Sequence, residues 1–371
     1  MVAKKVAIFT WYNEDRNCGQ TLQAYALQKA IEREVSDTST IIITYRNDVR
    51  KRIYRNWILY PLRRWLRMDS RMRKRQKKFD TFIAEYMKVS KPFYRKSQIL
   101  NYLRKENILN LVVGSDQVWN PQRKLDDVYL LNFGNGFHKM SYASSMMSPD
   151  LEMKYRNELI KASRYLDDFE FISVREKSAA IMLKKYVHKR ITNVLDPVFL
   201  LNRAEWEKIE KDPGMAGKKY ILVYCLGETE RCKNVVEKIE QRMENDIQIL
   251  YMDVDQKNEI PDNWNRIFNI GPAEFIWLVN HAEYVCCDSF HGTAFSIIFE
   301  KNFFVVPSIR TFASNMYRVT DLLDILHVKD RYIETEKFPE LKADYGSINI
   351  RLKEEMEKSR ECLRYILETN V

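Results

Sequence analysis

One short stretch, residues 284–293, combines groups that can transfer protons and bind anions. It presents the imidazole of His291 between the hydroxyls of Ser289 and Thr293, and Gly292 would let a ligand approach closely. An apolar run precedes this turn and a helical pattern follows it, so we expect it between the end of a strand and the start of a helix. Helix starts attract anions, which indicates a phosphorylated or carboxylated substrate and an acid/base role for His291. A capped turn with a surface histidine is the alternative.

Polar residues also follow two other predicted strands, at residues 6–10 and 108–113. The candidate ligand contacts there are Asn17, Gly19, Gln20, Asp116 and Gln117. The first turn matches neither of the glycine motifs of nucleotide-binding proteins, and a simple helix start is an equal alternative. Asp116 could position a sugar hydroxyl or a cation, or it could cap a helix without any ligand.

Arg175 ends another predicted strand, just before a helix. Its planar guanidinium suits a carboxylate or a phosphate, so we expect it to bind an anion. The alternative is an ion pair within the protein, with Glu176 or Asp196 as the partner.

The strands alternate with helices, which predicts an α/β fold with parallel sheets. A chain of 371 residues should form about two domains. The expected parts are a Rossmann-like domain over residues 1–200, a linker at 200–218, a second Rossmann-like domain over 201–345 carrying the Ser289–Thr293 turn, and a C-terminal helix over 346–371. Two such domains facing a cleft describe a GT-B-like architecture.

The net charge of +10 is concentrated in residues 46–78, which hold 14 Lys or Arg and two acidic residues. This segment opens a helical insertion at 46–105. Trp57, Tyr60 and Trp65 lie among its basic residues, which suits a helix on an anionic membrane surface. An amphipathic helix packed on its own domain is the equal alternative. The remainder of the chain is slightly acidic, which is not typical of a nucleic-acid-binding protein.

Six cysteines show neither CxxC nor metal-ligand spacing, so we expect reduced thiols and no bound metal. No stretch has the roughly 18 apolar residues of a membrane-spanning helix. We therefore expect a cytoplasmic protein, either free or peripheral on the inner face of the membrane.

Six short motifs occur in order along the chain, at residues 17–25, 114–120, 141–145, 173–176, 195–197 and 288–292. Together they resemble the polysaccharide pyruvyl transferase family over residues 6–325. The resemblance implies a GT-B-like fold and transfer of the enolpyruvyl unit of phosphoenolpyruvate to a glycan. The product would be a pyruvate ketal bridging two hydroxyls, with phosphate released. No cofactor or metal is implied besides this co-substrate, and the acceptor would be linked to a membrane lipid.

The resemblance also implies roles for the candidate residues. His291 and Asp116 would be catalytic. The implied donor-binding residues are Arg175, Ser289, Gly292, Thr293 and Arg318. The first-turn residues Asn17, Gly19 and Gln20, with Gln117, would bind the acceptor. Many family members have an arginine at the position of Ser289, and Arg175, Arg310 or Arg318 could replace it here.

Two other functions remain open. A nucleotide-sugar glycosyltransferase of surface polysaccharide synthesis would share the architecture and would release a nucleotide. A non-enzymatic binder of membranes or nucleic acids would use residues 46–78, but would leave the Ser289–Thr293 turn unexplained.

Overall fold

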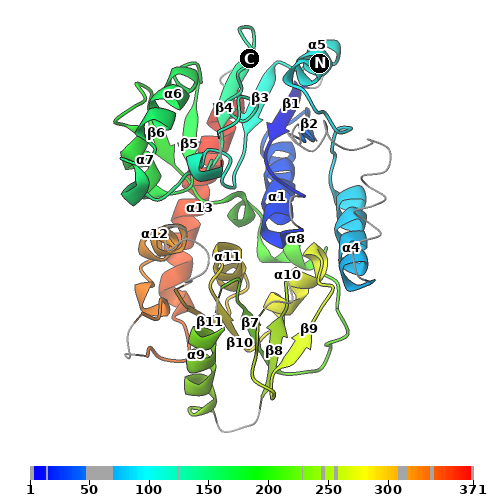
Figure 1. Cartoon of the computed structure of the whole chain (residues 1–371), viewed down its shortest axis with the longest axis vertical. Helices are drawn as coiled ribbons and strands as arrows, with labels where there is room; N and C mark the ends of the chain where they lie inside the picture. Colours follow the sequence, from blue (N-terminus) through cyan, green and yellow to red (C-terminus); the bar gives the residue numbers. More distant parts are fainter. Residues whose placement is uncertain are drawn as a thin grey trace. The chain divides into compact units, whose positions relative to one another are not determined.

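The computed structural model describes residues 4–13, 16–46, 70–123, 125–227, 229–243, 247–254, 258–307, 316–334 and 338–368. The chain divides into two compact units (Figure 1). Unit 1 comprises Met1–Leu200 with Lys358–Val371, and unit 2 comprises Leu201–Glu357.

The sheet of unit 1 has four parallel strands in the order β2-β1-β3-β4. Their bounds are β1 Lys4–Phe9, β2 Thr38–Ile42, β3 Asn110–Val113 and β4 His138–Ser141. The chain adds β2 on one side of β1 and then places β3 on the other side. The carboxyl ends of β1 and β3 therefore border a topological switch point, where open α/β sheets bind ligands.

Beyond β4, a parallel pair continues unit 1 through the isolated bridges Met140–Phe171 and Ser144–Val174. This pair consists of β5 Ile172–Val174 and β6 Ile191–Asn193. Among the described residues up to 200, the α-helices are α1 Cys18–Glu34, α4 Ser70–Tyr86, α5 Lys96–Lys105, α6 Arg156–Leu166 and α7 Lys177–Leu183. Short 3₁₀ helices are η1 Pro121–Arg123, η2 Pro149–Leu151 and η3 Pro197–Leu200. The apolar core of unit 1 includes Phe9, Val113, Trp119 and Phe169.

Unit 2 has a five-stranded parallel sheet in the order β11-β10-β7-β8-β9. Its strands are β7 Tyr220–Tyr224, β8 Gln248–Met252, β9 Asn265–Ile267, β10 Tyr284–Cys287 and β11 Asn302–Val305. Here the chain runs outward from β7 to β9 and returns to place β10 on the other side of β7. The β7/β10 edge is the switch point of this sheet.

The helices of unit 2 are α8 Arg203–Glu207, α9 Glu230–Glu240, α10 Pro272–Asn280, α11 Phe290–Ile298, α12 Tyr317–Ile325 and the 3₁₀ helix η5 Lys329–Arg331. The last helix, α13 Tyr345–Glu368, begins in unit 2, and its residues from Lys358 belong to unit 1. Among the described residues, no helix is long and apolar enough to cross a bilayer.

The predicted α/β class and its parallel sheets are confirmed. The helix–strand–turn–helix–strand order expected around residues 284–293 is present as α10, β10, α11 and β11. Two helices were not predicted: α8 lies inside the predicted linker, and α6 lies in a segment for which no element was predicted. Of the basic segment, residues 47–69, with Trp57, Tyr60 and Trp65, lie outside the described residues.

Candidate active site

The turn after β10 is anchored by Asp288, the first residue beyond the strand. Its carboxylate accepts hydrogen bonds of 2.7 Å from the backbone N–H groups of Leu226 and Gly227, in the turn after β7. The thiol of Cys225 lies 3.5 Å from the same carboxylate. Asp288 therefore ties together the two loops that border the switch point of unit 2.

Helix α11 begins with a side-chain cap. Ser289 has an extended backbone, with φ −117° and ψ 135°, and its Oγ accepts from the N–H of Gly292 at 3.4 Å. The hydroxyl of Thr293 donates to the backbone oxygen of Ser289 at 3.0 Å, and Thr293 is fully buried. Both hydroxyls thus stabilise the helix start, and this geometry does not support the donor-binding roles predicted for them.

Gly292 serves packing rather than ligand approach. A Cβ atom at this position would lie 3.0 Å from Sγ of Cys287 and 3.1 Å from Cδ1 of Tyr224. Both neighbours belong to strands of the sheet, so glycine lets α11 lie closely on it. This packing accounts for a glycine at position 292, and the predicted contact with the donor stays a prediction.

His291 is the second residue of α11, near the positive end of the helix dipole. Its ring meets that of Phe290 edge-on, with centroids 5.2 Å apart, and 8% of its surface is exposed. The imidazole is thus buried beside the switch point of unit 2, the place where open α/β sheets generally bind ligands. This position suits a group that transfers a proton to or from a bound substrate.

Arg318 lies in the first turn of α12, a helix that packs against α11 within unit 2. Its side chain is half-buried. It remains a candidate donor ligand because its helix adjoins the one that carries His291. Arg310, the other candidate, lies outside the described residues.

The cysteines around this turn are packing residues. All six cysteines of the chain are buried and free. Burial raises the pKa of the Cys287 thiol to about 12, so it stays protonated near neutral pH. This agrees with the expectation of reduced thiols and gives no nucleophile at the turn.

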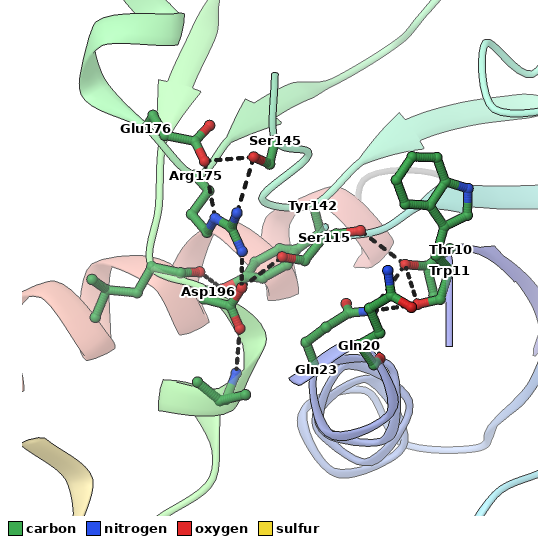
Figure 2. Close-up of polar contacts among 12 residues, drawn as sticks. Thr10, Trp11, Gln20, Gln23, Ser115, Tyr142, Ser145, Arg175, Glu176 and Asp196 are labelled. Carbon is green, nitrogen blue, oxygen red and sulfur yellow. Dashed lines mark hydrogen bonds and ion pairs between the residues drawn. The ribbon is translucent and has the colours of Figure 1, made fainter. Parts of the chain in front are cut away.

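In unit 1, side chains of α1 meet the turn after β3 at the β1/β3 switch point (Figure 2). The hydroxyl of Thr10 donates to the backbone oxygen of Ser115 at 2.8 Å and accepts from Nε2 of Gln23 at 3.1 Å. The same Nε2 donates to the backbone oxygens of Trp11 and Gln20, at 2.8 and 2.9 Å. These bonds hold the start of α1 against the turn that carries Asp116.

Most of the residues predicted to bind the acceptor are buried around the start of α1 and the turn after β3. Asn17 caps α1, since its Oδ1 accepts from the N–H of Gln20 at 3.3 Å. This contact is what the alternative to ligand binding, a simple helix start, requires of the turn. Gly19 is buried in the first helical turn. Gln117 is 3% exposed, whereas Gln20 and Asp116 keep 7% and 6% of their surface. The latter two are thus better placed to contact a ligand.

Arg175 forms the ion pairs that were the alternative to anion binding (Figure 2). Its Nε donates to Glu176 at 3.0 Å, its Nη1 to Asp196 at 2.7 Å and its Nη2 to the hydroxyl of Ser145 at 2.9 Å. Burial alone would lower the pKa of Arg175, but the carboxylates of Glu176, Asp196 and Asp116 raise it above its ordinary value. The guanidinium stays charged and forms ion pairs with Glu176 and Asp196, so the structure favours a structural role over donor binding.

The family follows from comparison with known sequences. The model of the polysaccharide pyruvyl transferase family matches residues 17–308, which include both switch-point turns. The chain belongs to the polysaccharide pyruvyl transferase family. A comparison with curated proteins finds no match.

Several solved structures resemble this pyruvyl transferase chain over nearly its whole length. Staphylococcal (S. aureus) MnaA in complex with UDP has a TM-score of 0.54 and 12% identity, covering 97% of this chain and 90% of its own. UDP-GlcNAc 2-epimerase of Neisseria meningitidis, bound to UDP-GlcNAc, has a TM-score of 0.54 and 8% identity, and the match covers 97% of this chain and 94% of the epimerase. Arabidopsis thaliana UGT89C1, complexed with UDP-L-rhamnose, has a TM-score of 0.50 and 10% identity, and the match covers 97% of this chain and 94% of UGT89C1. Identities this low show the fold alone, and the predicted GT-B-like fold is confirmed.

Two residues of the candidate site, Asp288 and Gln23, lie in the sequence motifs, but no role was predicted for either of them. Asp288 could have been suspected, because an acidic residue between a buried strand and a helix cap needs a partner. Gln23 carried no such signal, since its three hydrogen bonds go to atoms that only the fold brings near. Among the described residues, no group of three or more His, Cys, Asp or Glu side chains is arranged to hold a metal ion.

Proposed function

We propose that this chain transfers the pyruvyl group of phosphoenolpyruvate to a glycan and closes a ketal across two sugar hydroxyls. Membership of the pyruvyl transferase family supports the reaction class. The observation that carries the proposal is the position of His291 in the first turn of α11, beside the switch point of unit 2. There an acid/base group adjoins a helix start that favours a carboxylate or phosphate.

The chemistry can be written in two balanced steps. A proton is added to the methylene carbon of phosphoenolpyruvate while one sugar hydroxyl forms a bond to C2 and loses its proton. The second hydroxyl then attacks C2 and loses its proton, the bond from C2 to the phosphate oxygen breaks, and the phosphate leaves as hydrogen phosphate with that proton. His291 would supply the proton to the methylene carbon, because histidine can donate near neutral pH. Asp116 would accept or orient a hydroxyl of the acceptor, and no metal ion would be needed.

The test is phosphate release from phosphoenolpyruvate in the presence of a panel of glycan acceptors, with mass spectrometry of the glycans. We expect free phosphate and a mass gain equal to pyruvic acid less one water. His291→Ala should lower the rate of both signals by roughly 10²–10⁴. His188→Ala is the matched control, because the side chain of His188 is 91% exposed on unit 1. Release of UDP or GDP from nucleotide sugars, with no reaction of phosphoenolpyruvate, would instead identify a glycosyltransferase.

We further propose that the acceptor is linked to a membrane lipid and that the basic segment, residues 46–78, docks the enzyme on an anionic membrane. Support comes from helix α4, whose first half holds most of the described basic residues of the segment. Its apolar residues Phe79 and Phe82 are buried, and Phe82 packs against Tyr25 at 5.7 Å. Lys74 and Lys77 are exposed on α4, and we propose that they contact lipid headgroups on the inner face of the membrane.

A further inference from the structure

Large apolar side chains are exposed on one surface of unit 1, formed by α6 and α7. Six large apolar side chains are exposed among the described residues, and three of them lie here. Ile160 is on α6, Ile181 is on α7 and is 58% exposed, and Met153 lies just before α6 and is 75% exposed. Contiguous exposed apolar side chains of this size indicate an interaction surface.

Contacts at both ends of α6 hold it beside the end of α7. Glu152, the neighbour of Met153 in the chain, pairs with Lys185 at 2.7 Å. Asp167, directly after α6, accepts from the backbone N–H of His188 at 2.9 Å. Both helices lie at the edge of unit 1 that carries β6 (Figure 1). The three apolar side chains therefore belong to one surface.

Basic side chains flank the isoleucines at helical spacing. On α7, Lys177 precedes Ile181 by four residues and Lys184 follows it by three, so the three side chains share a face. On α6, Arg164 follows Ile160 by four residues. All three cations are exposed, and none forms an ion pair with a described residue. We call this surface the basic face; it consists of Met153, Ile160, Arg164, Lys177, Ile181 and Lys184.

The last turns of α13, which belong to unit 1, carry the opposite pattern. Glu361 precedes Tyr365 by four residues and Glu368 follows it by three. These three side chains are exposed, Tyr365 by 58%, whereas Leu363 and Leu367 are buried. We call Glu361, Tyr365 and Glu368 the acidic stripe. A helical rise of about 1.5 Å per residue places the outer charges about 10 Å apart both here and on α7, with an apolar side chain between them.

We propose that unit 1 binds a second copy of this chain, with the acidic stripe of one copy against the basic face of the other. Each row has a charge at both ends and an apolar side chain in the middle, so opposite charges meet in either helix direction. Tyr365 would pack on Ile181 and remove apolar surface from water. Because the two surfaces differ, each copy offers one of each, and the contacts close into a symmetric dimer or a ring.

The exposed side chains favour a protein partner over a lipid surface. Met153, Ile160 and Ile181 are aliphatic, whereas membrane interfaces favour the rings of Trp and Tyr. Methionine and arginine are enriched at protein interfaces. The inference uses no residue of the candidate active site and does not depend on the proposed function.

The test is sedimentation velocity of the full chain over a range of micromolar concentrations, at low and at high salt. The two variants are Lys177→Glu/Lys184→Glu on the basic face and Glu361→Lys/Glu368→Lys on the acidic stripe. All four side chains are exposed, so both variants should fold, which circular dichroism checks. Lys74→Glu/Lys77→Glu is the matched control, because it makes the same charge change on α4, a helix that packs against α1.

We expect the wild type and the control to self-associate, and the association to weaken with salt. Each of the two variants alone should associate at least about tenfold more weakly, because like charges then face one another. An equimolar mixture of the two variants should regain the wild-type affinity. In that mixture every contact between unlike chains again brings opposite charges together.

The inference is overturned if the wild type stays monomeric over the whole range, if the two variants associate like the wild type, or if their mixture fails to regain affinity. A monomeric wild type that cosediments with phosphatidylglycerol vesicles, and loses this binding in Lys177→Glu/Lys184→Glu, would assign the basic face to a membrane instead. None of these results depends on phosphate release, so the proposed reaction is tested separately.

Discussion

Replacing Arg175 by methionine separates its structural role from donor binding. Its side chain is 3% exposed and those of Glu176 and Asp196 are 1% and 0%, at contact distances of 3.0 and 2.7 Å. Removing one partner of a buried ion pair leaves an uncompensated charge and typically costs about 3–5 kcal/mol. Whole domains are stable by only about 5–15 kcal/mol, so Arg175→Met should strongly destabilise unit 1. Arg175→Lys should cost less, because it keeps the charge but loses the planar fork.

The matched control is Lys185→Met, also in unit 1. Lys185 pairs with Glu152 at 2.7 Å, but its side chain is 59% exposed, and such pairs contribute about 0–1 kcal/mol. Urea unfolding followed by circular dichroism gives the stabilities, and hydrogen exchange in peptides from residues 110–200 assigns the loss to unit 1. If Arg175→Met unfolds like the wild type but shows a raised KM for phosphoenolpyruvate, the structural role argued from burial is refuted. The result would instead support a donor-binding role for Arg175.

The other predictions concern the reaction and the membrane. His291→Ala should lower turnover by roughly 10²–10⁴ with an unchanged circular dichroism spectrum, and a near-normal rate would reject the acid/base role. Asp288→Asn leaves the backbone N–H of either Leu226 or Gly227 without an acceptor. We therefore expect the free energy of unfolding to fall by about 1–3 kcal/mol and turnover in steady-state assays to slow. EDTA should leave activity unchanged, and loss of activity restored by Mg²⁺ or Mn²⁺ would contradict metal independence. Liposome cosedimentation should require anionic lipid, weaken with salt and fall when Trp57 and Trp65 become alanine; protein left in the supernatant at low salt would argue against docking.

The fold around residues 284–293 could be predicted because several local signals agree there. A short apolar strand, a serine cap and a helical apolar pattern each mark the same boundaries. Helix α6 carries a comparable pattern, with Leu159, Ala162 and Leu166 buried on one face. This spacing would have sufficed to predict the helix, although none was predicted there.

The roles of individual side chains were harder to predict, because a role depends on partners distant in sequence. The sequence could name Asp196 as a possible partner of Arg175, but not decide between that pair and a ligand. It could not show that Gly292 faces Cys287 and Tyr224 rather than a substrate. Nor could it show that Asp288 accepts from N–H groups 61 and 62 residues earlier in the chain.

The two switch points differ in the charges they present, and this bears on how the donor is held. At unit 1, Asp116 lies among carboxylates, which suits a hydroxyl donor. At unit 2, two backbone N–H groups donate to the carboxylate of Asp288 and stabilise its charge, and the start of α11 favours an anion. At the position where the resemblance implies an arginine, this chain has Ser289, whose hydroxyl caps α11. The proposed donor, phosphoenolpyruvate, carries both a phosphate and a carboxylate, and Arg318, on the helix that adjoins α11, is a candidate cation for one of them.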